Sequence, residues 1–161
     1  MSTSCQATTN ASSMTTEIFP IEIERTPFAA WAAMWLDYLG GHAEARNPEQ
    51  HQITYSRLVD PAVNLFGLVA GGRKPIGFAH FYFHPSTYHA YEDCCLQDLY
   101  VHPDARGCGV GRALVEQVAT IARARGAPVL HWKTRESNVT AQSMYARFAQ
   151  RTEFVSFRLP L

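Results

Sequence analysis

The stretch LQDLYVHPDARGCGVGR, residues Leu96–Arg112, decides the fold of this chain. Its first half is typical of a strand that ends at a proline turn, and its second half is a glycine-rich loop that opens a helix. Gly107, Gly109 and Gly111 allow close backbone approach and dihedral angles that other residues avoid. Unpaired N–H groups at a helix start attract an anion, so the stretch predicts a phosphate or pyrophosphate site.

Two common phosphate-binding loops do not fit this stretch. A P-loop needs a lysine followed by Ser or Thr at the end of its motif, and no such lysine follows here. A Rossmann fingerprint stands in the first strand–helix turn of its domain, with an acidic residue about 20 positions later. The run Gly107–Gly111 gives only GxGxG and comes late in the chain. A glycine-rich loop alone is also compatible with a purely structural turn.

Working outward from this stretch, the hydrophobic periodicity predicts an α/β (α+β) fold. We expect the order β-α-α-β-β-β-α-β-α-β, with about four helices on the faces of a mixed, mostly antiparallel twisted sheet. Thr26 is expected as the N-cap of the first helix, and Asn47, before Pro48, as the N-cap of the second. The expected strands are 18–24, 64–70, 76–84, 94–101, 129–134 and 153–159, and the expected helices are 27–39, 48–59, 111–125 and 138–149.

The composition is that of a neutral, foldable chain. Its 161 residues are 47% apolar and only 17% charged, which excludes a disordered protein. Because 14 basic residues balance 14 acidic ones, no nucleic-acid partner is expected. No apolar run reaches the ~18 residues of a membrane span, so no membrane partner is expected. Residues 1–16 are predicted to be a disordered tail, with Met1 or Met14 as the start, and residues 17–161 a single domain.

The cysteines and histidines form no recognisable metal site. The four cysteines fit neither a zinc pattern nor a CxxC redox pair. Reduced thiols are typical of a cytoplasmic protein, and this is the compartment expected here. His80 and His84 share one face of a predicted strand, but no third ligand is placed near them, so no metal is expected.

The run Arg106–Gly111 resembles the Arg/Gln-x-x-Gly-x-Gly/Ala signature of the GNAT superfamily of N-acetyltransferases. Three segments, LQDLYVHPDARGCGVGRAL, LHWKTRESNVTAQSMYARFA and the terminal FVSFRLPL, resemble its diamine/polyamine and histone acetyltransferase-like branch. The resemblance covers residues 18–161 and is strongest from Leu96 to Phe148. It implies a GNAT-like fold with acetyl-CoA as the cosubstrate.

The resemblance also implies where acetyl-CoA binds. The strands at 94–101 and 129–134 would splay apart, and the thioester would lie in the gap between them. The first of these strands would pair through its backbone with the pantetheine arm, as an added strand pairs with a sheet edge. The pyrophosphate would lie on the glycine-rich loop. The implied cofactor-binding residues are Leu99, Tyr100, Val101, Arg106, Gly107, Cys108, Gly109, Val110, Gly111, Arg112, Asn138, Ala141 and Tyr145.

N-acetyl transfer in this family implies direct attack of an amine on the thioester within a ternary complex. Only the neutral amine is nucleophilic, so a base or a water chain must take a proton. A backbone N–H near the end of the strand at 94–101 can stabilise the oxyanion. Tyr145 matches the family's general acid, which protonates the leaving thiolate. The helical spacing of Tyr145 also fits a core aromatic residue.

The chain departs from the branch at the residue expected to act as the base. The branch typically has Leu-Glu-Asp where this chain has Leu-Gln-Asp, and Gln97 cannot accept a proton at neutral pH. A regular strand would turn Asp98 to the face opposite Gln97. A water chain, Glu92, Asp93 and His80 remain alternative bases. The residues expected to line the amine site are His80, Tyr82, Glu92, Asp93 and Gln97; a partly exposed polar face is the competing interpretation.

The leading hypothesis is an acetyl-CoA-dependent N-acetyltransferase. Its acceptor would be a primary amine: a polyamine or diamine, a lysine side chain or a small amino compound. The alternative from another class is a GNAT-like module that senses acetyl-CoA without turnover, which the missing glutamate at position 97 keeps open. A nucleotide-binding protein with a different phosphate ligand is the third hypothesis. Because the family commonly dimerises, a homodimer is expected.

Overall fold

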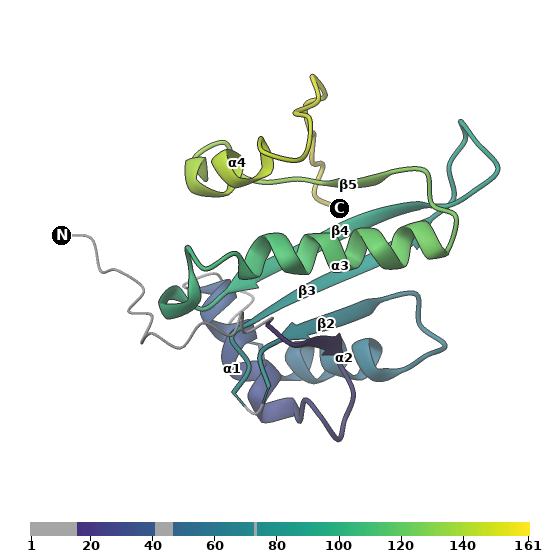
Figure 1. Cartoon of the computed structure of the whole chain (residues 1–161). Coiled ribbons are helices and arrows are strands. Elements are labelled where there is room, and N and C mark those ends of the chain that lie inside the picture. The colour runs from purple at the N-terminus through teal and green to yellow at the C-terminus, as the bar shows by residue number, and fades with distance from the viewer. Residues whose placement is uncertain (1–15, 41–46, 73) are drawn as a thin grey trace.

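The described part of the chain forms one five-stranded sheet with helices on both faces (Figure 1). The computed structural model describes residues 16–40, 47–72 and 74–161. The strands are β1 (Ile18–Pro20), β2 (Phe66–Ala70), β3 (Gly77–His84), β4 (Asp93–Val101) and β5 (Leu130–Trp132). The helices are α1 (Phe28–Leu39), α2 (Pro48–Val59), α3 (Val110–Ala124) and α4 (Val139–Tyr145), with a short 3-10 turn, η2 (Pro103–Ala105). None of the described helices is long and apolar enough to cross a lipid bilayer.

The sheet has the mixed topology that the sequence predicts. Its spatial order is β1-β2-β3-β4-β5, and the first four strands pair antiparallel. The last pair, β4 and β5, is parallel, because α3 crosses over one face of the sheet between them. The core divides at the sheet. On one face Leu114 of α3 packs near Phe81, and on the other Trp31 of α1 packs near Phe78.

A β-bulge interrupts the pairing of β3 with β4. His80 pairs with Asp98, but the next residue, Phe81, pairs with Leu96, so Gln97 is an extra residue without a cross-strand partner. The bulge changes the phase of β4, and Asp98 therefore lies beside His80 on the α1 face. A regular strand would have placed Asp98 on the α3 face with Leu96. Opposite faces for Gln97 and Asp98 were expected only of a regular strand, and the bulge removes that condition.

The two helix caps predicted from the sequence fare differently. Asn47 caps α2 as expected, since its Oδ1 accepts the Gln50 N–H at 3.1 Å. Thr26 does not cap α1, because Pro27 occupies the N-cap position and no side chain caps it. The Thr26 hydroxyl is buried and has no hydrogen-bond partner within the described residues. Its backbone carbonyl instead accepts the Tyr55 hydroxyl at 2.7 Å.

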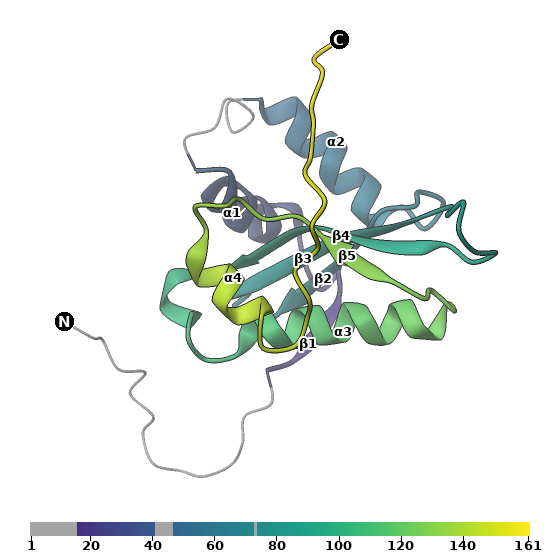
Figure 2. The ribbon, with the colours of Figure 1, turned by 90° about the horizontal axis from the view of Figure 1, so that it is seen from above.

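The C-terminal segment differs most from the prediction. The helix expected to reach residue 149 ends at Tyr145, and a turn follows in which the Ala149 N–H donates to the Tyr145 carbonyl at 2.9 Å. The strand predicted at 153–159 is absent, so the element order ends on α4. The segment runs as exposed extended chain, and Figure 2 shows it leaving the sheet toward the free C-terminus. A strand needs a neighbour to bond its backbone, and none of the described strands pairs with this segment.

Candidate active site

The parallel pairing of β4 and β5 covers only three residue pairs and ends at Leu96 and Trp132. Beyond that point β4 continues to Val101 with β3 on one side only. The His102 N–H donates to the Ile76 carbonyl, and backbone groups alternate sides along a ladder. Those of Tyr100 therefore point to β3, and those of Leu99 and Val101 point to the open side. Within the described residues the structure thus has an opening between β4 and β5, along which the backbone groups of Leu99 and Val101 face no neighbouring strand; we call it the β4–β5 gap.

The glycine-rich loop lies at the far end of this gap. Gly107 and Gly109 have φ values of 79° and 81°, in the left-handed region that favours glycine. Gly109 is the N-cap of α3, so the first N–H groups of that helix, at residues 109–112, have no intrahelical partner. A Cβ on Gly111 would lie 3.5 Å from Val101 and 3.4 Å from Met144, which places the helix start against β4 and α4. The loop therefore has the left-handed glycines and the unpartnered helix start on which the predicted anion site depends.

The two arginines of the loop point in different directions. The Arg106 Nε donates to the Val101 carbonyl at 3.0 Å, on the open side of β4. Arg112 forms an ion pair with Glu116, one helical turn later, at 2.7 Å. Both side chains are exposed and reach solvent beside the helix start. Two cations at this helix terminus favour an anionic group there.

Tyr145 ends α4 at the β5 side of the gap. Its ring packs edge-on against Trp132, with 5.1 Å between the ring centroids. Burial raises the pKa of the Tyr145 hydroxyl, so it stays protonated at neutral pH. Asn138 fixes the start of this helix, because its Oδ1 accepts the Ala141 N–H at 3.3 Å. The predicted residues Asn138 and Ala141 therefore bond to each other and set the position of Tyr145.

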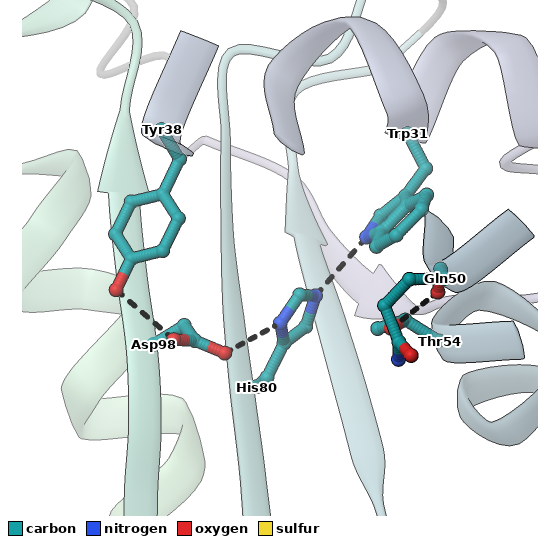
Figure 3. A network of polar contacts seen from close by, with 6 residues as sticks. All are labelled: Trp31, Tyr38, Gln50, Thr54, His80 and Asp98. Carbon is teal, nitrogen blue, oxygen red and sulfur yellow. Dashed lines mark hydrogen bonds and ion pairs between the residues drawn. The ribbon is translucent and has the colours of Figure 1, made fainter. Parts of the chain in front are cut away.

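A network of hydrogen bonds runs across β3 and β4 on the α1 face of the sheet, beside the bulge (Figure 3). The Trp31 Nε1–H donates to His80 Nε2 at 3.1 Å, and His80 Nδ1 lies 3.0 Å from Asp98 Oδ2. The Tyr38 hydroxyl donates to Asp98 Oδ1 at 3.0 Å. Because the indole N–H can only donate, His80 Nε2 must be the acceptor and Nδ1 must carry the hydrogen. Both ring nitrogens of His80 are engaged, so the geometry speaks against His80 as a general base.

The pKa of Tyr38 links this hydrogen-bond network to residues on the β5 side of the gap. Burial, followed by the charge and the hydrogen bond of Asp98, raises the pKa of Tyr38. Tyr145 raises it further and Arg135 lowers it, so both residues act electrostatically on Tyr38. Residues from α1, β4 and α4 are therefore electrostatically linked near the point where β4 and β5 part.

The other residues expected to line the amine site are not brought together. Tyr82 lies across from Cys95, and its hydrogen bond with that thiol, together with burial, raises the pKa of Tyr82 to about 12. Glu92 is exposed in the loop before β4. Asp93 begins β4 opposite His84, at the other end of the strand from the glycine-rich loop. Gln97 is the exposed bulge residue.

Sequence reasoning missed two residues of this site, Trp31 and Tyr38, and did not place Asp98 beside His80. Trp31 and Tyr38 are seven positions apart and so share a helix face, which the apolar stripe of α1 could have indicated. Nothing in the local sequence marks the bulge that turns Asp98 toward them. In the ranges 16–40, 47–72 and 74–161, no three His, Cys, Asp or Glu side chains are placed to hold a metal ion.

Comparison with known proteins gives a consistent match. The model of the Acetyltransferase (GNAT) family matches residues 28–149. The D-amino-acid N-acetyltransferase HPA3 of Saccharomyces cerevisiae is 36% identical over 84% of this chain and 86% of its own length. The aminoglycoside N(6')-acetyltransferase type 1 of Klebsiella aerogenes is 29% identical over 86% of this chain and 94% of its own length.

Solved structures resemble the fold at lower sequence identity. The aminoglycoside acetyltransferase AAC(6')-Iy, in complex with a bisubstrate analogue, superimposes with a TM-score of 0.76 at 20% identity, over 91% of this chain and 98% of its own. The aminoglycoside acetyltransferase meta-AAC0020, from an uncultured soil metagenomic sample and in complex with sisomicin, gives 0.77 at 15% identity, over 91% and 96%. These two likenesses concern the fold alone.

Proposed function

Because the chain belongs to the Acetyltransferase (GNAT) family, we propose that it transfers the acetyl group of acetyl-CoA to the primary amine of a small amino compound. Its enzyme class, an acetyl-CoA-dependent N-acetyltransferase, follows from the family. The observation that carries the proposal is the β4–β5 gap, which has the start of α3 at its far end and Tyr145 beside its opening. We take residues 17–161 as the catalytic domain.

The residues along the gap suit the parts of acetyl-CoA. The Leu99 carbonyl and the Val101 N–H face the open side of β4 and suit the amides of the pantetheine arm, which would bond to them as a strand would. The N–H groups at 109–112, with Arg106 and Arg112 nearby, suit the pyrophosphate. When bound, acetyl-CoA supplies an activated acetyl group as its thioester.

The chain's own residues then have distinct tasks in the transfer. The amine nitrogen bonds to the acetyl carbon while the bond from that carbon to sulfur breaks, and the sulfur keeps the electron pair. The N–H of Leu99 points into the gap, where it can stabilise the oxygen that gains charge. Tyr145 gives its hydroxyl proton to the leaving sulfur. The proton lost by the amine passes to water, and Tyr145 recovers a proton from water.

The named relatives support a small acceptor. They include enzymes named for D-amino acids, for aminoglycosides and, in Bos taurus, for thialysine. Each of these acceptors is a small molecule with a primary amine, rather than a lysine in a folded protein. We therefore favour a small amino compound over a protein lysine or a polyamine.

An acceptor panel tests the proposal. The purified chain is mixed with acetyl-CoA and a D-amino acid, an aminoglycoside, a diamine or a lysine peptide, and the release of CoA thiol and the acetylated product are measured. We expect thiol release with at least one small amine and little with the peptide. Saturable acetyl-CoA binding without release for any amine would identify the non-catalytic sensor instead.

We also propose that the chain works as a homodimer in the cytoplasm. Residues 155, 157, 159 and 161 are all apolar and alternate with other residues, which is the pattern of a strand with one buried face. Phe157 and Leu159 are nevertheless 92% and 82% exposed, so the C-terminal segment has apolar surface to bury on another copy. The four cysteines fit neither a zinc pattern nor a CxxC redox pair, which is typical of reduced thiols and supports a reducing compartment.

A further inference from the structure

We propose that Asp98 binds the ammonium group of the acceptor, and that Trp31 and His80 act as positioning residues that keep its carboxylate available for this task. The inference rests on the proposed transfer to an amine and names the residue that selects the acceptor.

The bulge brings Asp98 to the right place. Gln97 takes up the extra position in β4, and Asp98 is the next residue, two positions after Leu96, which is the last residue of β4 that pairs with β5. The Asp98 side chain is 14% exposed, so its carboxylate is held but can still be reached. His80 and Tyr38 each bond one of its oxygens. A carboxylate has about four acceptor positions, so acceptor capacity is left for the N–H groups of a substrate.

The hydrogen bond from Trp31 determines the charge beside Asp98. His80 is 1% exposed and Trp31 is fully buried. If His80 took up a second proton, two N–H donors would face each other in a buried site, and one would lose its acceptor. His80 therefore stays neutral and meets Asp98 as a hydrogen-bond donor without a positive charge. Asp98 keeps its negative charge for a cationic substrate instead of sharing it with an imidazolium.

The other ionisable groups around this pair do not cancel the charge of Asp98. From α1, Tyr38 bonds Asp98, and burial raises the pKa of Tyr38, so it remains a neutral donor. Asp37, also on α1, bonds the hydroxyl of Tyr100 on β4. From the far side of the gap Tyr145 and Arg135 act on Tyr38. Arg135 is exposed, and its positive charge is screened by solvent.

The first test compares acceptors by charge. An alkylamine is an ammonium ion at neutral pH, whereas an arylamine is neutral. Asp98→Asn keeps the size of the side chain and removes its charge. We expect kcat/KM for the alkylamine to fall roughly 10- to 150-fold, the worth of a hydrogen bond to a charged group, and that for the arylamine to fall less than about threefold. Equal losses for the two acceptors, or no loss for the alkylamine, would overturn the assignment.

A binding measurement separates this inference from the proposed function. The alkylamine is titrated calorimetrically into the chain saturated with CoA, and the experiment needs no turnover. Weaker binding to Asp98→Asn than to wild type supports the anchor even if wild type acetylates nothing, in which case only the proposed function fails. Unchanged binding rejects the anchor even if wild type is an active enzyme.

The second test asks whether Trp31 keeps His80 neutral. Trp31→Phe removes the indole N–H, so a second proton on His80 Nε2 no longer meets another donor, and the imidazolium formed on acidification can pair with Asp98. The ratio of variant to wild-type kcat/KM for the alkylamine should then fall between pH 7.5 and pH 5.5. The ratio removes the ionisation of the amine itself, which is common to both proteins.

Trp35→Phe is the matched control for this test. Trp35 lies on the same helix with its ring centroid 5.4 Å from that of His80, but its indole N–H has no hydrogen-bond partner within the described residues. Its ratio to wild type should not change with pH. A ratio for Trp31→Phe that is equally independent of pH would overturn the role of Trp31. If Trp31→Phe does not fold, as circular dichroism would show, His80→Gln replaces it and should weaken alkylamine binding about tenfold or more; unchanged binding would overturn the role of His80.

Discussion

Replacing Tyr145 by phenylalanine removes one hydroxyl from the candidate site and leaves the ring in place. The ring packs against Trp132 at 5.1 Å and Phe148 at 6.3 Å between centroids, and both contacts survive the change. The free energy of unfolding should therefore change by about 1 kcal/mol at most, the worth of a single hydrogen bond. Because the substitution does not touch the glycine-rich loop or the backbone of β4, the affinity for acetyl-CoA should stay within about twofold of wild type.

The effect on turnover should be much larger. A positioned general acid is worth about 10²–10⁴-fold in rate, which corresponds to roughly 3–5 kcal/mol in the activation barrier. The proton is needed only as the carbon–sulfur bond breaks, so kcat should fall while KM for the amine changes little. Burial raises the pKa of Tyr145, so wild-type activity should show no loss of this acid until the pH exceeds about 10.

The assay follows CoA thiol release at saturating acetyl-CoA, with the chemical step shown to limit the rate. Tyr88→Phe is the control, since that tyrosine is 94% exposed in the loop before β4 and should give wild-type kcat. Wild-type turnover in Tyr145→Phe would refute the assignment and make Tyr145 a core aromatic residue. A fall in melting temperature large enough to account for the lost rate would refute it as well.

Three further predictions concern the loop, the sheet and the C-terminal segment. Gly109→Asp should weaken acetyl-CoA binding, measured by calorimetry, at least tenfold, or about 1.4 kcal/mol. The control is Gly126→Asp, which has a similar φ of 80° at the other end of α3 and should lower stability but not affinity. Equal losses of affinity in the two variants would contradict the placement of the pyrophosphate on the loop. Burial, and then the charge of His84, lowers the pKa of His131, so only the unfolded state takes up this proton as the pH falls below about 6.5. The melting temperature should therefore drop on acidification, and it should drop less in His131→Gln. Identical pH profiles of the melting temperature in the two proteins would contradict this role of His131. Phe157→Glu should shift the chain from dimer to monomer in light scattering without lowering its melting temperature, and an unchanged dimer would locate the interface elsewhere.

The sequence predicts the parts of this fold that depend on local chemistry. The left-handed glycines of the loop, the Asn47 cap and the apolar face of α3 each follow from a few neighbouring residues, and the structure confirms them. The opening between β4 and β5 was implied by the resemblance to the GNAT superfamily. Its position depends on where β5 ends, and the strand predicted at 129–134 extends two residues beyond the observed end at Trp132.

The parts that the sequence could not predict depend on contacts between distant segments. The bulge at Gln97 arises from the pairing of β3 with β4, and a period-two pattern cannot show it. The bond between Trp31 and His80 joins residues 49 positions apart. The segment at 153–159 has the alternation of a strand, but a strand also needs a partner, which the described chain does not supply.

A single turnover tests the central claim most directly. The chain is saturated with acetyl-CoA and mixed rapidly with an excess of the best amine from the panel. The reaction is quenched at intervals, and mass spectrometry measures the small molecules and the mass of the intact protein. Direct transfer predicts that N-acetylamine and CoA appear together, one for each bound acetyl-CoA, while the mass of the protein never changes. Acetyl groups that appear first on the protein, for example on Cys95, or bound acetyl-CoA that no amine consumes, would contradict the account.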